Sequence, residues 1–466
     1  MIELIVGAVE KKTPEAIAAA VSRLIRSGGI ASGDRLPTVR ELAGALGVSP
    51  ATVSNAWQAL AGVGLITSRG RAGSFVLHAS TTWMPTHFAE LAGSHVEARL
   101  DLSSGTPDPN LLPSLEAALA RVPARADTSS YLNQRVLPEL ERHLRAAWPY
   151  SPESITILDG ALDAVSRSLE MVVRYGDRVI VEDPGFPPFF DLIEQLGAER
   201  VPVAMDMQGM RPDALAIALG TNPAAIVLQN RAHNPTGASM TRERAEQLVR
   251  VLKAHSHVTD PVIIEDDHSG EISSMPAISL GSWLPHRVLH IRSYAKSHGP
   301  DLRIGALGGP AALLNPIVAR RMLGPGWTSR MLQVILYELL TAPSSVAEVA
   351  LARDTYAARQ RALQAALARR GLAIEASDGI NAWLPVHDER SAMVALAASG
   401  IRVAAGTSFQ ASLGPGGAEP GAGASGAAGA APASRQFVRV TAGLVESDAE
   451  EVAGLLAAAA LGESAA

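Results

Sequence analysis

Cysteine is missing from this 466-residue chain. Without thiols the protein has neither a disulfide framework nor a cysteine-ligated metal site, and no metal centre is predicted. No uninterrupted apolar run approaches the roughly 20 residues of a membrane-spanning helix, and the N-terminus lacks a basic segment followed by an apolar one. We therefore expect no membrane association and no signal peptide, and by default a soluble protein with a cytoplasmic location.

Charge is unevenly distributed along the chain. The formal net charge is −6, which argues against a general nucleic-acid binder. Residues 1–78, however, hold eight Lys or Arg against five Asp or Glu, a net +3 that leaves −9 for the remainder. The length and the 47% apolar content allow two or three domains. The pattern predicts a small basic domain joined to a large acidic one.

Residues 1–78 predict a small helical domain that ends in a hairpin. Helix-start signals stand at Thr13–Glu15, Thr38–Glu41 and Ser49–Pro50. Gly47 makes a tight turn between the second and third helices, and residues 66–76 hold two strand-like runs around basic residues. Two short helices joined by a Gly-containing turn and followed by a basic hairpin predict a winged helix-turn-helix.

We expect the third helix to be a recognition helix that reads double-stranded DNA. Its outward polar side chains would meet phosphates and base edges in the major groove, and nearby arginines would meet the phosphate backbone. The predicted DNA-binding residues are Arg40, Ser49, Thr52, Asn55, Arg69 and Arg71. The alternative is a helical protein-interaction module, in which these side chains are merely solvated.

A longer motif favours the DNA-binding interpretation. Residues 33–43 read Gly-Asp-Arg-Leu-Pro-Thr-Val-Arg-Glu-Leu-Ala, followed by Leu-Gly-Val-Ser at 46–49 and Gly-Ser-Phe-Val at 73–76. With these runs in this order, most of residues 13–76 resembles the DNA-binding domain of the GntR family of bacterial regulators. The resemblance implies a sequence-specific DNA reader.

The chain changes character after this domain. Residues 79–98 have no clean periodicity and read as a linker, with a short helix expected around Phe88–Leu91. Over residues 99–466 strand-like runs alternate with helical ones, which predicts an α/β domain with a mostly parallel sheet and ligands at the carboxyl ends of its strands. Residues 413–434, almost wholly Gly, Ala, Pro and Ser, read as a mobile surface insertion without chemistry.

Three strand-like runs end in residues suited to a pyridine-aldehyde phosphate. Lys296 follows Val288–Ile291, and a buried lysine amine can form an imine with an aldehyde. Asp266 follows Val262–Ile264, and a carboxylate there would keep a pyridine nitrogen protonated. Asn234 follows residues 225–228 and would donate to the phenolic oxygen of the ring. These residues predict pyridoxal 5'-phosphate as the cofactor.

Further residues complete this candidate site. Ser293 and Arg303 would anchor the phosphate, together with the backbone amides of Gly160, Ala161 and Leu162 at a helix start, while Phe186 would stack on the ring. Each has an ordinary structural alternative, since Asn-Pro-Thr-Gly is often a turn, an aspartate can cap a helix, and a phenylalanine can be a core aromatic. Their occurrence together and in this order favours the cofactor.

Residues 99–466 resemble the fold-type I aminotransferases, and the whole chain resembles the MocR subfamily of GntR regulators. The resemblance implies a homodimer, in which Tyr131 reaches the cofactor phosphate of the partner subunit. It also implies that Arg439 grips the carboxylate of an effector. Where the family usually has tyrosine this chain has His268, which would bond the phenolic oxygen and titrate near neutrality.

Three functions fit this combination of domains. The first is a pyridoxal-phosphate-dependent regulator that binds an operator with two half-sites and senses an amino acid or a form of vitamin B6. The second is a working aminotransferase that carries a DNA-binding head. The third, an empty structural domain on a DNA-binding dimer, is disfavoured because Lys296, Asp266 and Arg303 are all present. The intact recognition helix and wing favour the regulator.

Overall fold

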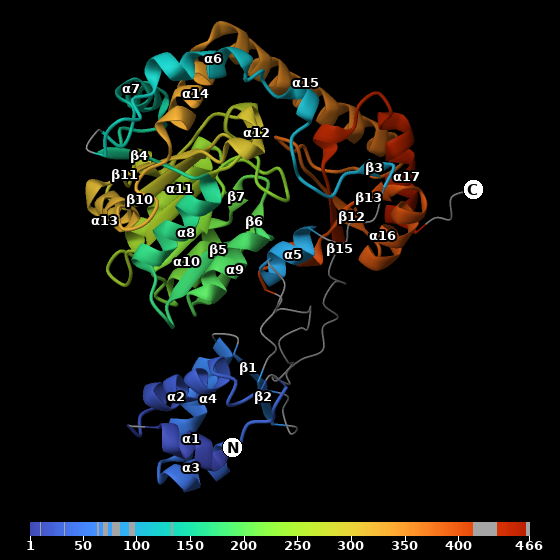
Figure 1. Cartoon of the computed structure of the whole chain (residues 1–466). Coiled ribbons are helices and arrows are strands. Elements are labelled where there is room, and N and C mark those ends of the chain that lie inside the picture. Colours follow the sequence, from blue (N-terminus) through green and yellow to red (C-terminus); the bar gives the residue numbers. More distant parts are fainter. Residues whose placement is uncertain are drawn as a thin grey trace. The chain divides into compact units, whose positions relative to one another are not determined.

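The computed structural model of the chain divides into two compact units, Met1–Pro85 and Thr86–Ala466 (Figure 1). The division falls inside the segment predicted to be a linker. The structure describes residues 1–9, 11–31, 33–62, 65–68, 73–76, 84–92, 98–131, 134–412 and 436–462. The Gly/Ala-rich segment 413–434 therefore lies outside the described residues.

The first unit is a helical cluster with a small hairpin. Its elements are α1 (Ile2–Ala8), α2 (Pro14–Arg26), α3 (Val39–Leu46), α4 (Pro50–Gly62) and the antiparallel pair β1 (Ile66–Ser68) and β2 (Ser74–Val76). Thr38 and Glu41 form the capping box of α3, and Gly47 ends this helix with a φ of 66°. The helix-turn-helix prediction is thus confirmed, but the sequence reasoning missed α1, whose Ile5 is fully buried.

The second unit is built on an eight-stranded mixed sheet. Its strand order is β4-β11-β10-β9-β8-β5-β6-β7. Pairing is parallel from β10 through β9, β8 and β5 to β6, and antiparallel at both edges, so the predicted α/β class with a mostly parallel sheet is confirmed. In sheet order the strands are Ser154–Leu158, Gly305–Gly309, Val288–Ser293, Val262–Asp267, Ala225–Leu228, Arg178–Asp183, Glu199–Asp206 and Gly209–Met210.

Helices cover both faces of this sheet (Figure 1). Successive strand residues face opposite layers: Ile264 packs with α8, α9 and α13, whereas Ile263 packs with α10 and α11. At the β4 edge a further cluster joins Tyr294 to α7 and α14. The bounds are α6 (Glu116–Arg125), α7 (Pro138–Ala147), α8 (Ala161–Val172), α9 (Pro187–Gln195), α10 (Pro212–Leu219), α11 (Arg242–Ala254), α13 (Ala311–Arg321) and α14 (Arg330–Thr341).

A smaller C-terminal layer carries the second half of the candidate site. The strand β15 (Gln436–Val440) lies between β12 (Ala382–Val386) and β14 (Ala404–Ala405), while β3 (Leu100–Asp101) pairs in parallel with β13 (Ile401–Arg402). The helices α15 (Pro343–Arg369), α16 (Glu389–Ala398) and α17 (Ala449–Leu461) complete this layer. Among the described residues no single helix meets the length and apolarity needed to cross a membrane; only α14 and α15 do so together, as a pair bent by 73°.

A short helix in the predicted linker is docked on the second unit. In α5 (Thr86–Ala92) the backbone N–H groups of His87 and Phe88 donate to the Asp191 carboxylate of α9, at 3.0 and 2.8 Å. The ring of His87 contacts Glu194 at 3.2 Å, and Glu194 also pairs with Arg200 at 3.1 Å. Asp191 of α9 therefore caps the N-terminus of α5, a helix about 100 residues earlier in the sequence.

Asp191→Ala should loosen α5 without unfolding the unit. Loss of a helix cap costs roughly 0.5–2 kcal/mol, so amide hydrogen exchange in α5 should accelerate by about tenfold. Mass-spectrometric hydrogen exchange measures this directly, with Asp354→Ala on the exposed face of α15 as the matched control. Unchanged exchange in Asp191→Ala would show that apolar contacts alone hold α5.

Candidate functional site

Neighbouring strand ends bring the predicted cofactor residues together. Asp266 of β9 is the register partner of Ile291 in β10, and Lys296 follows that strand within the short helix α12 (Ala295–His298). On the other side of β9, Gln229 comes directly after β8. Because these parallel strands end at one edge of the sheet, side chains far apart in sequence face one space.

Asp266 has one carboxylate oxygen held and one free. Its Oδ2 accepts a hydrogen bond of 2.9 Å from the Gln229 side-chain amide, whereas its Oδ1 is buried and has no partner among the described residues. Burial raises the pKa of Asp266 to about 7, and the charges of Asp267 and Glu182 act in the same direction. A cationic ring N–H would satisfy the free oxygen and favour the ionised carboxylate, so Asp266 fits the pyridine nitrogen of the cofactor.

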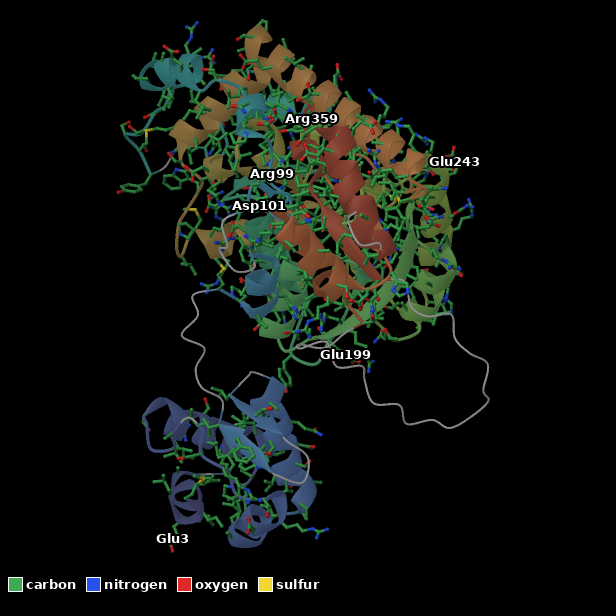
Figure 2. The ribbon with its side chains drawn as sticks, turned by 90° about the vertical axis from the view of Figure 1, so that its right-hand side faces the viewer. Glu3, Arg99, Asp101, Glu199, Glu243 and Arg359 are labelled. Atoms are coloured by element: carbon green, nitrogen blue, oxygen red, sulfur yellow. The ribbon has the colours of Figure 1, made fainter. Side chains whose placement is uncertain are left out.

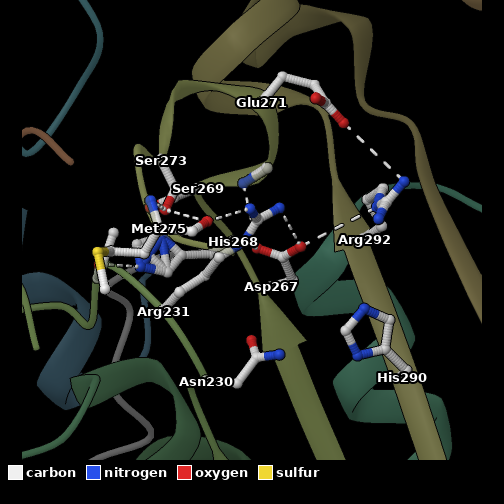
Figure 3. Close-up of polar contacts among 12 residues, drawn as sticks. Asn230, Arg231, Asp267, His268, Ser269, Glu271, Ser273, Met275, His290 and Arg292 are labelled. Carbon is white, nitrogen blue, oxygen red and sulfur yellow. Dashed lines mark hydrogen bonds and ion pairs between the residues drawn. The ribbon is translucent and has the colours of Figure 1, made fainter. Parts of the chain in front are cut away.

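The adjacent aspartate has a different task. Asp267 receives two hydrogen bonds from Arg231, at 2.8 and 2.7 Å (Figure 3). Burial alone would raise the pKa of Asp267, but the Arg231 guanidinium outweighs it and holds the pKa below its usual range. Asp267 is thus already paired, which leaves Asp266 as the carboxylate available to a ligand.

Lys296 is a lysine prepared to react as a neutral amine. Burial and the positive charge of Arg439 together lower the pKa of Lys296 to about 8, against the opposing charge of Asp266. The ammonium Nζ donates to the backbone carbonyl of Gly105. An amine of this kind can bond covalently to an aldehyde near neutral pH.

The phosphate-binding residues form a cradle around a helix start. Gly160, with a φ of 106°, precedes the first turn of α8, whose amides have no partner within the helix. A Cβ added at Gly160 would lie 3.5 Å from the Arg303 guanidinium. Ser293 is buried at the end of β10, and its Oγ accepts from the Ala295 amide at 3.3 Å. The helix N-terminus and the arginine fit a phosphate.

Asn234 and Arg439 face each other across the site. Arg439 Nη1 donates to Asn234 Oδ1 at 3.2 Å, and Nη2 donates to the Ser103 carbonyl. Burial lowers the pKa of Arg439 to about 9, against the attraction of Asp101, which is labelled in Figure 2. Its Nε has no partner, and none of the described carboxylates forms an ion pair with it. A buried cation without a counter-charge is suited to the carboxylate of a ligand.

His268 lies near the site but does not titrate as the sequence suggested. Its Nε2–H donates to the Ala232 carbonyl at 2.9 Å, and its Nδ1 is 3.4 Å from the Ser269 hydroxyl (Figure 3). Burial lowers the pKa of His268 to about 3, and the charge of Lys296 adds to this effect. The expectation of titration near neutrality is wrong, because the imidazole is neutral throughout the range between pH 5 and 8.

The two aromatic predictions fall in different places. Phe186 is the N-cap residue of α9, half-buried and edge-on to Phe189 with ring centroids 5.2 Å apart. Tyr131 is 87% exposed and touches Trp327 edge-on at 6.2 Å. Tyr131 is thus free to reach outward, which a role in a partner subunit requires, and that role stays a prediction.

The predicted DNA-binding residues lie in the first unit. Ser49 caps α4, since its Oγ accepts from the Thr52 amide at 3.2 Å and contacts the Thr52 hydroxyl at 2.9 Å. Arg40 on α3 and Asn55 on α4 are exposed. Arg69 and Arg71 lie outside the described residues.

Sequence reasoning missed four residues that build the site. Gln229 bridges the site. Its side-chain NH₂ group donates to Asp266, and its side-chain oxygen accepts from the backbone N–H of Asn234 at 2.8 Å. Gly105, at a φ of 61°, leaves no room for a Cβ beside Arg439, and Ser103 supplies a carbonyl to it. The ring of Phe409 lies 5.0 Å from the guanidinium carbon. Only Gln229 had a sequence signal, its position after a buried strand.

Known proteins share both parts of the chain. Residues 97–453 match the family model "Aminotransferase class I and II", and residues 13–76 match "Bacterial regulatory proteins, gntR family". The chain is 36% identical to the vitamin B6 salvage pathway transcriptional repressor PtsJ of Salmonella typhimurium, over 86% of this chain and 92% of that protein. It is 28% identical to the pyridoxine biosynthesis transcriptional regulator PdxR of Corynebacterium glutamicum, over 64% and 66% of the two chains.

Solved structures support the fold of the second unit. Aspartate aminotransferase from Thermus thermophilus superposes with a TM-score of 0.65 at 22% identity, over 78% of this chain and 92% of that one. The fold and the site together define a helix-turn-helix head joined to an aminotransferase-like domain. The chain belongs to the GntR family of transcriptional regulators, in its MocR-type subgroup, and the cofactor of its large domain is pyridoxal 5'-phosphate.

Cofactor loading should report the lowered pKa of Lys296. Because only the neutral amine attacks the aldehyde, the rate of loading should rise with pH around a midpoint near 8, whereas an ordinary lysine has its midpoint near 10.5. Stopped-flow absorbance from pH 6 to 10 measures the rate. A midpoint above 10 would contradict the buried amine.

Borohydride reduction should fix the cofactor to Lys296. The chain has four lysines, at positions 11, 12, 253 and 296, so peptide mapping identifies the modified one. Lys296→Ala should lose the fixed adduct, and an adduct on another lysine would overturn the assignment.

Substitutions in the first unit should separate phosphate contacts from base contacts. Arg40→Ala should weaken DNA binding for all sequences and reduce the slope of log affinity against log salt by about 1. Asn55→Ala should cost about 1–3 kcal/mol on the preferred sequence only. Fluorescence anisotropy at several salt concentrations measures both, with Gln58→Ala on α4 as the control. Unchanged DNA binding in both variants would contradict the prediction that α3 and α4 contact DNA through these residues.

Proposed function

We propose that this regulator is a homodimer whose DNA affinity is set by ligands of the large domain: pyridoxal 5'-phosphate, and an amino acid that binds over it. The observation that carries the proposal is the pair of buried, uncompensated groups, Asp266 Oδ1 and the Arg439 guanidinium, on either side of Lys296. One suits a ring N–H and the other a carboxylate. When bound, the cofactor supplies an aldehyde and an electron-withdrawing ring.

The proposed homodimer rests on an exposed apolar surface. Leu119 on α6, Leu323 after α13 and Met331 on α14 are 51%, 80% and 48% exposed, and Tyr131 is the most exposed large side chain of this region. Since α6 packs on α14, Leu119 and Met331 belong to neighbouring elements. Such a surface supports contact with a second copy, and a two-fold dimer matches an operator with two half-sites.

The names of the relatives support vitamin B6 as part of the signal. PtsJ and PdxR are named for vitamin B6 salvage and pyridoxine biosynthesis. A regulator of that supply needs a site that fills as pyridoxal phosphate becomes abundant, and the Asp266, Lys296 and Arg303 set provides one. The cofactor would then be the primary signal, and Arg439 would add recognition of an amino acid.

A second candidate function is transamination, because the lysine, aspartate and arginine of an aminotransferase are all present. A primary amine whose carboxylate is held by Arg439 would compete with Lys296 for the aldehyde and release the lysine amine. The released lysine is the group that could next move a proton. A keto-acid assay under DNA-binding conditions therefore belongs to every test of the regulator.

The structure supports a route from this site towards the linker. Phe186 is the N-cap of α9, and Asp191 on the same helix caps α5. The helix α5 also contacts the turn Thr407–Phe409, whose phenylalanine faces Arg439. A ligand that changes either contact would bias the docking of α5 by the difference in its affinity for the two arrangements.

Arg439→Ala should abolish the response to amino acids. We expect DNA affinity to change by about 5- to 150-fold on ligand binding, the ordinary range of such coupling. Anisotropy with DNA selected from a random library gives the affinity, with pyridoxal phosphate saturating and each amino acid present or absent. Arg250→Ala, on the exposed side of α11, should respond as the unchanged protein does.

One outcome would contradict the proposal. DNA affinity that is the same with and without cofactor, and with every amino acid, would remove the sensor. Steady keto-acid production in that case would establish the aminotransferase.

A further inference from the structure

A separate cavity lies on the other side of the lysine helix. It has a volume of about 200 Å³ and is bounded by α7, the C-terminal end of α14 and the N-terminal part of α15. Its polar lining consists of His143, Glu271, Arg292, Tyr294, His298 and Arg353, and the rest is apolar. Neither Lys296 nor Asp266 lines it, so it is distinct from the cofactor site.

The geometry of α12 separates the two spaces. Tyr294 and His298 are four residues apart and their ring centroids lie 5.7 Å apart, so the two rings share one side of the helical turn. Lys296 is two residues from each, about 200° around the helix, and it points to Gly105. One short helix thus presents its lysine to the cofactor and its aromatic side to the cavity.

Two buried side chains at the cavity each have a donor group without an acceptor among the described residues. The Tyr294 hydroxyl is in a side chain that is 1% exposed, and it has no hydrogen-bond partner among the described residues. Burial raises the pKa of Tyr294, against the opposing effect of the nearby Arg292, so the hydroxyl stays protonated and can donate. A buried donor without a partner costs about 1–3 kcal/mol, which a bound acceptor would recover.

Arg292 is the second donor. Its Nη2 donates to the Ala147 carbonyl at 3.0 Å, but its Nε has no hydrogen-bond partner in the part of the chain that the structure describes. The nearest carboxylate oxygens, on Glu271 and Asp267, are 3.9 and 4.0 Å away, beyond hydrogen-bond length (Figure 3). Asp267 is already committed to Arg231 by two shorter bonds. Arg292 is therefore only loosely paired: it has these two long ion pairs and a contact with the Trp148 ring at 5.5 Å, and its Nε–H can still donate to a ligand while the residue is 4% exposed.

The rest of the lining limits the ligand. Leu144, Leu339 and Val349 provide an apolar wall that suits a hydrocarbon body. Burial lowers the pKa of His298 to about 4, so it adds no positive charge at neutral pH. The Glu271 carboxylate near Arg292 opposes a ligand with two negative charges. An apolar cavity of about 150 Å³ holds a benzene molecule, so 200 Å³ holds a benzene-sized body with one carboxylate.

We propose that this cavity is a second ligand site, which binds a small monocarboxylic acid through Arg292 and Tyr294. Arg292 is the register partner of Asp267 in the sheet, and Tyr294 stands two residues before Lys296. A carboxylate bound to Arg292 and Tyr294 would restrict the motion of the segment that carries Lys296. The second site would therefore affect cofactor binding through the position of that lysine. The assignment does not depend on which ligand the cofactor site senses.

Benzoate is the probe for this site. Calorimetric titration of the full-length, cofactor-loaded protein should detect its binding, and Arg439→Ala removes the other arginine that a carboxylate could use. In the Arg439→Ala background, Tyr294→Phe should weaken benzoate binding by about tenfold, as expected for loss of a hydrogen bond to a charged group. Ala350→Phe, which places a ring in the cavity, should abolish binding while it leaves Arg292 and Tyr294 intact.

Tyr294→Phe also has a folding control built into it. Because the Tyr294 hydroxyl has no hydrogen-bond partner among the residues described, its removal should leave the thermal unfolding temperature unchanged or raise it. A lower unfolding temperature would show that the hydroxyl is satisfied within the fold, which overturns the argument. So would benzoate binding that disappears in Arg439→Ala, benzoate binding that Ala350→Phe leaves intact, or no benzoate binding in any variant.

Discussion

The hydrogen bond from the Gln229 side chain to Asp266 is the interaction on which the cofactor site depends. It holds one oxygen of a buried carboxylate and leaves the other free. The same side chain accepts from the backbone N–H of Asn234, and the side-chain oxygen of Asn234 in turn accepts from Arg439. A single amide thus fixes the distance between the group that would meet the ring nitrogen and the group that would meet a carboxylate. Two buried atoms of this network, Asp266 Oδ1 and Arg439 Nε, lack partners among the described residues, and a ligand that satisfies them would strengthen the whole network.

Much of the fold could be predicted because strand ends and helix caps have local signals. The run Ala225–Leu228 is a strand over the same residues as the sequence pattern, and the capping box at Thr38 opens a helix as expected. Lys296 and Asp266 were found because each follows a buried, β-branched run. These predictions rest on neighbours in sequence, and the parallel sheet brings the strand ends together without further information.

What could not be predicted depends on contacts between distant residues. Asp191 caps a helix about 100 positions away, and nothing near it in sequence distinguishes it from any exposed aspartate on a helix. Gly105 is required because Arg439 fills the space beside it. The pKa of His268 follows from burial and the charge of Lys296, whereas the sequence offers only the ordinary value for an imidazole. Tertiary environment decided each of these cases.

Electrostatics explains how such a site can signal without turnover. Burial and Arg439 lower the pKa of Lys296, and Asp266 opposes them. A ligand carboxylate that neutralises Arg439 therefore raises the pKa of Lys296 and favours its protonated form, which cannot hold the aldehyde. The same ligand offers its own amine in exchange, so carboxylate binding and lysine release support each other. Because coupling is reciprocal, the release of Lys296 would strengthen carboxylate binding by the same factor. In the proposed function, this mutual dependence would give the site two distinct states for the DNA-binding domain to report.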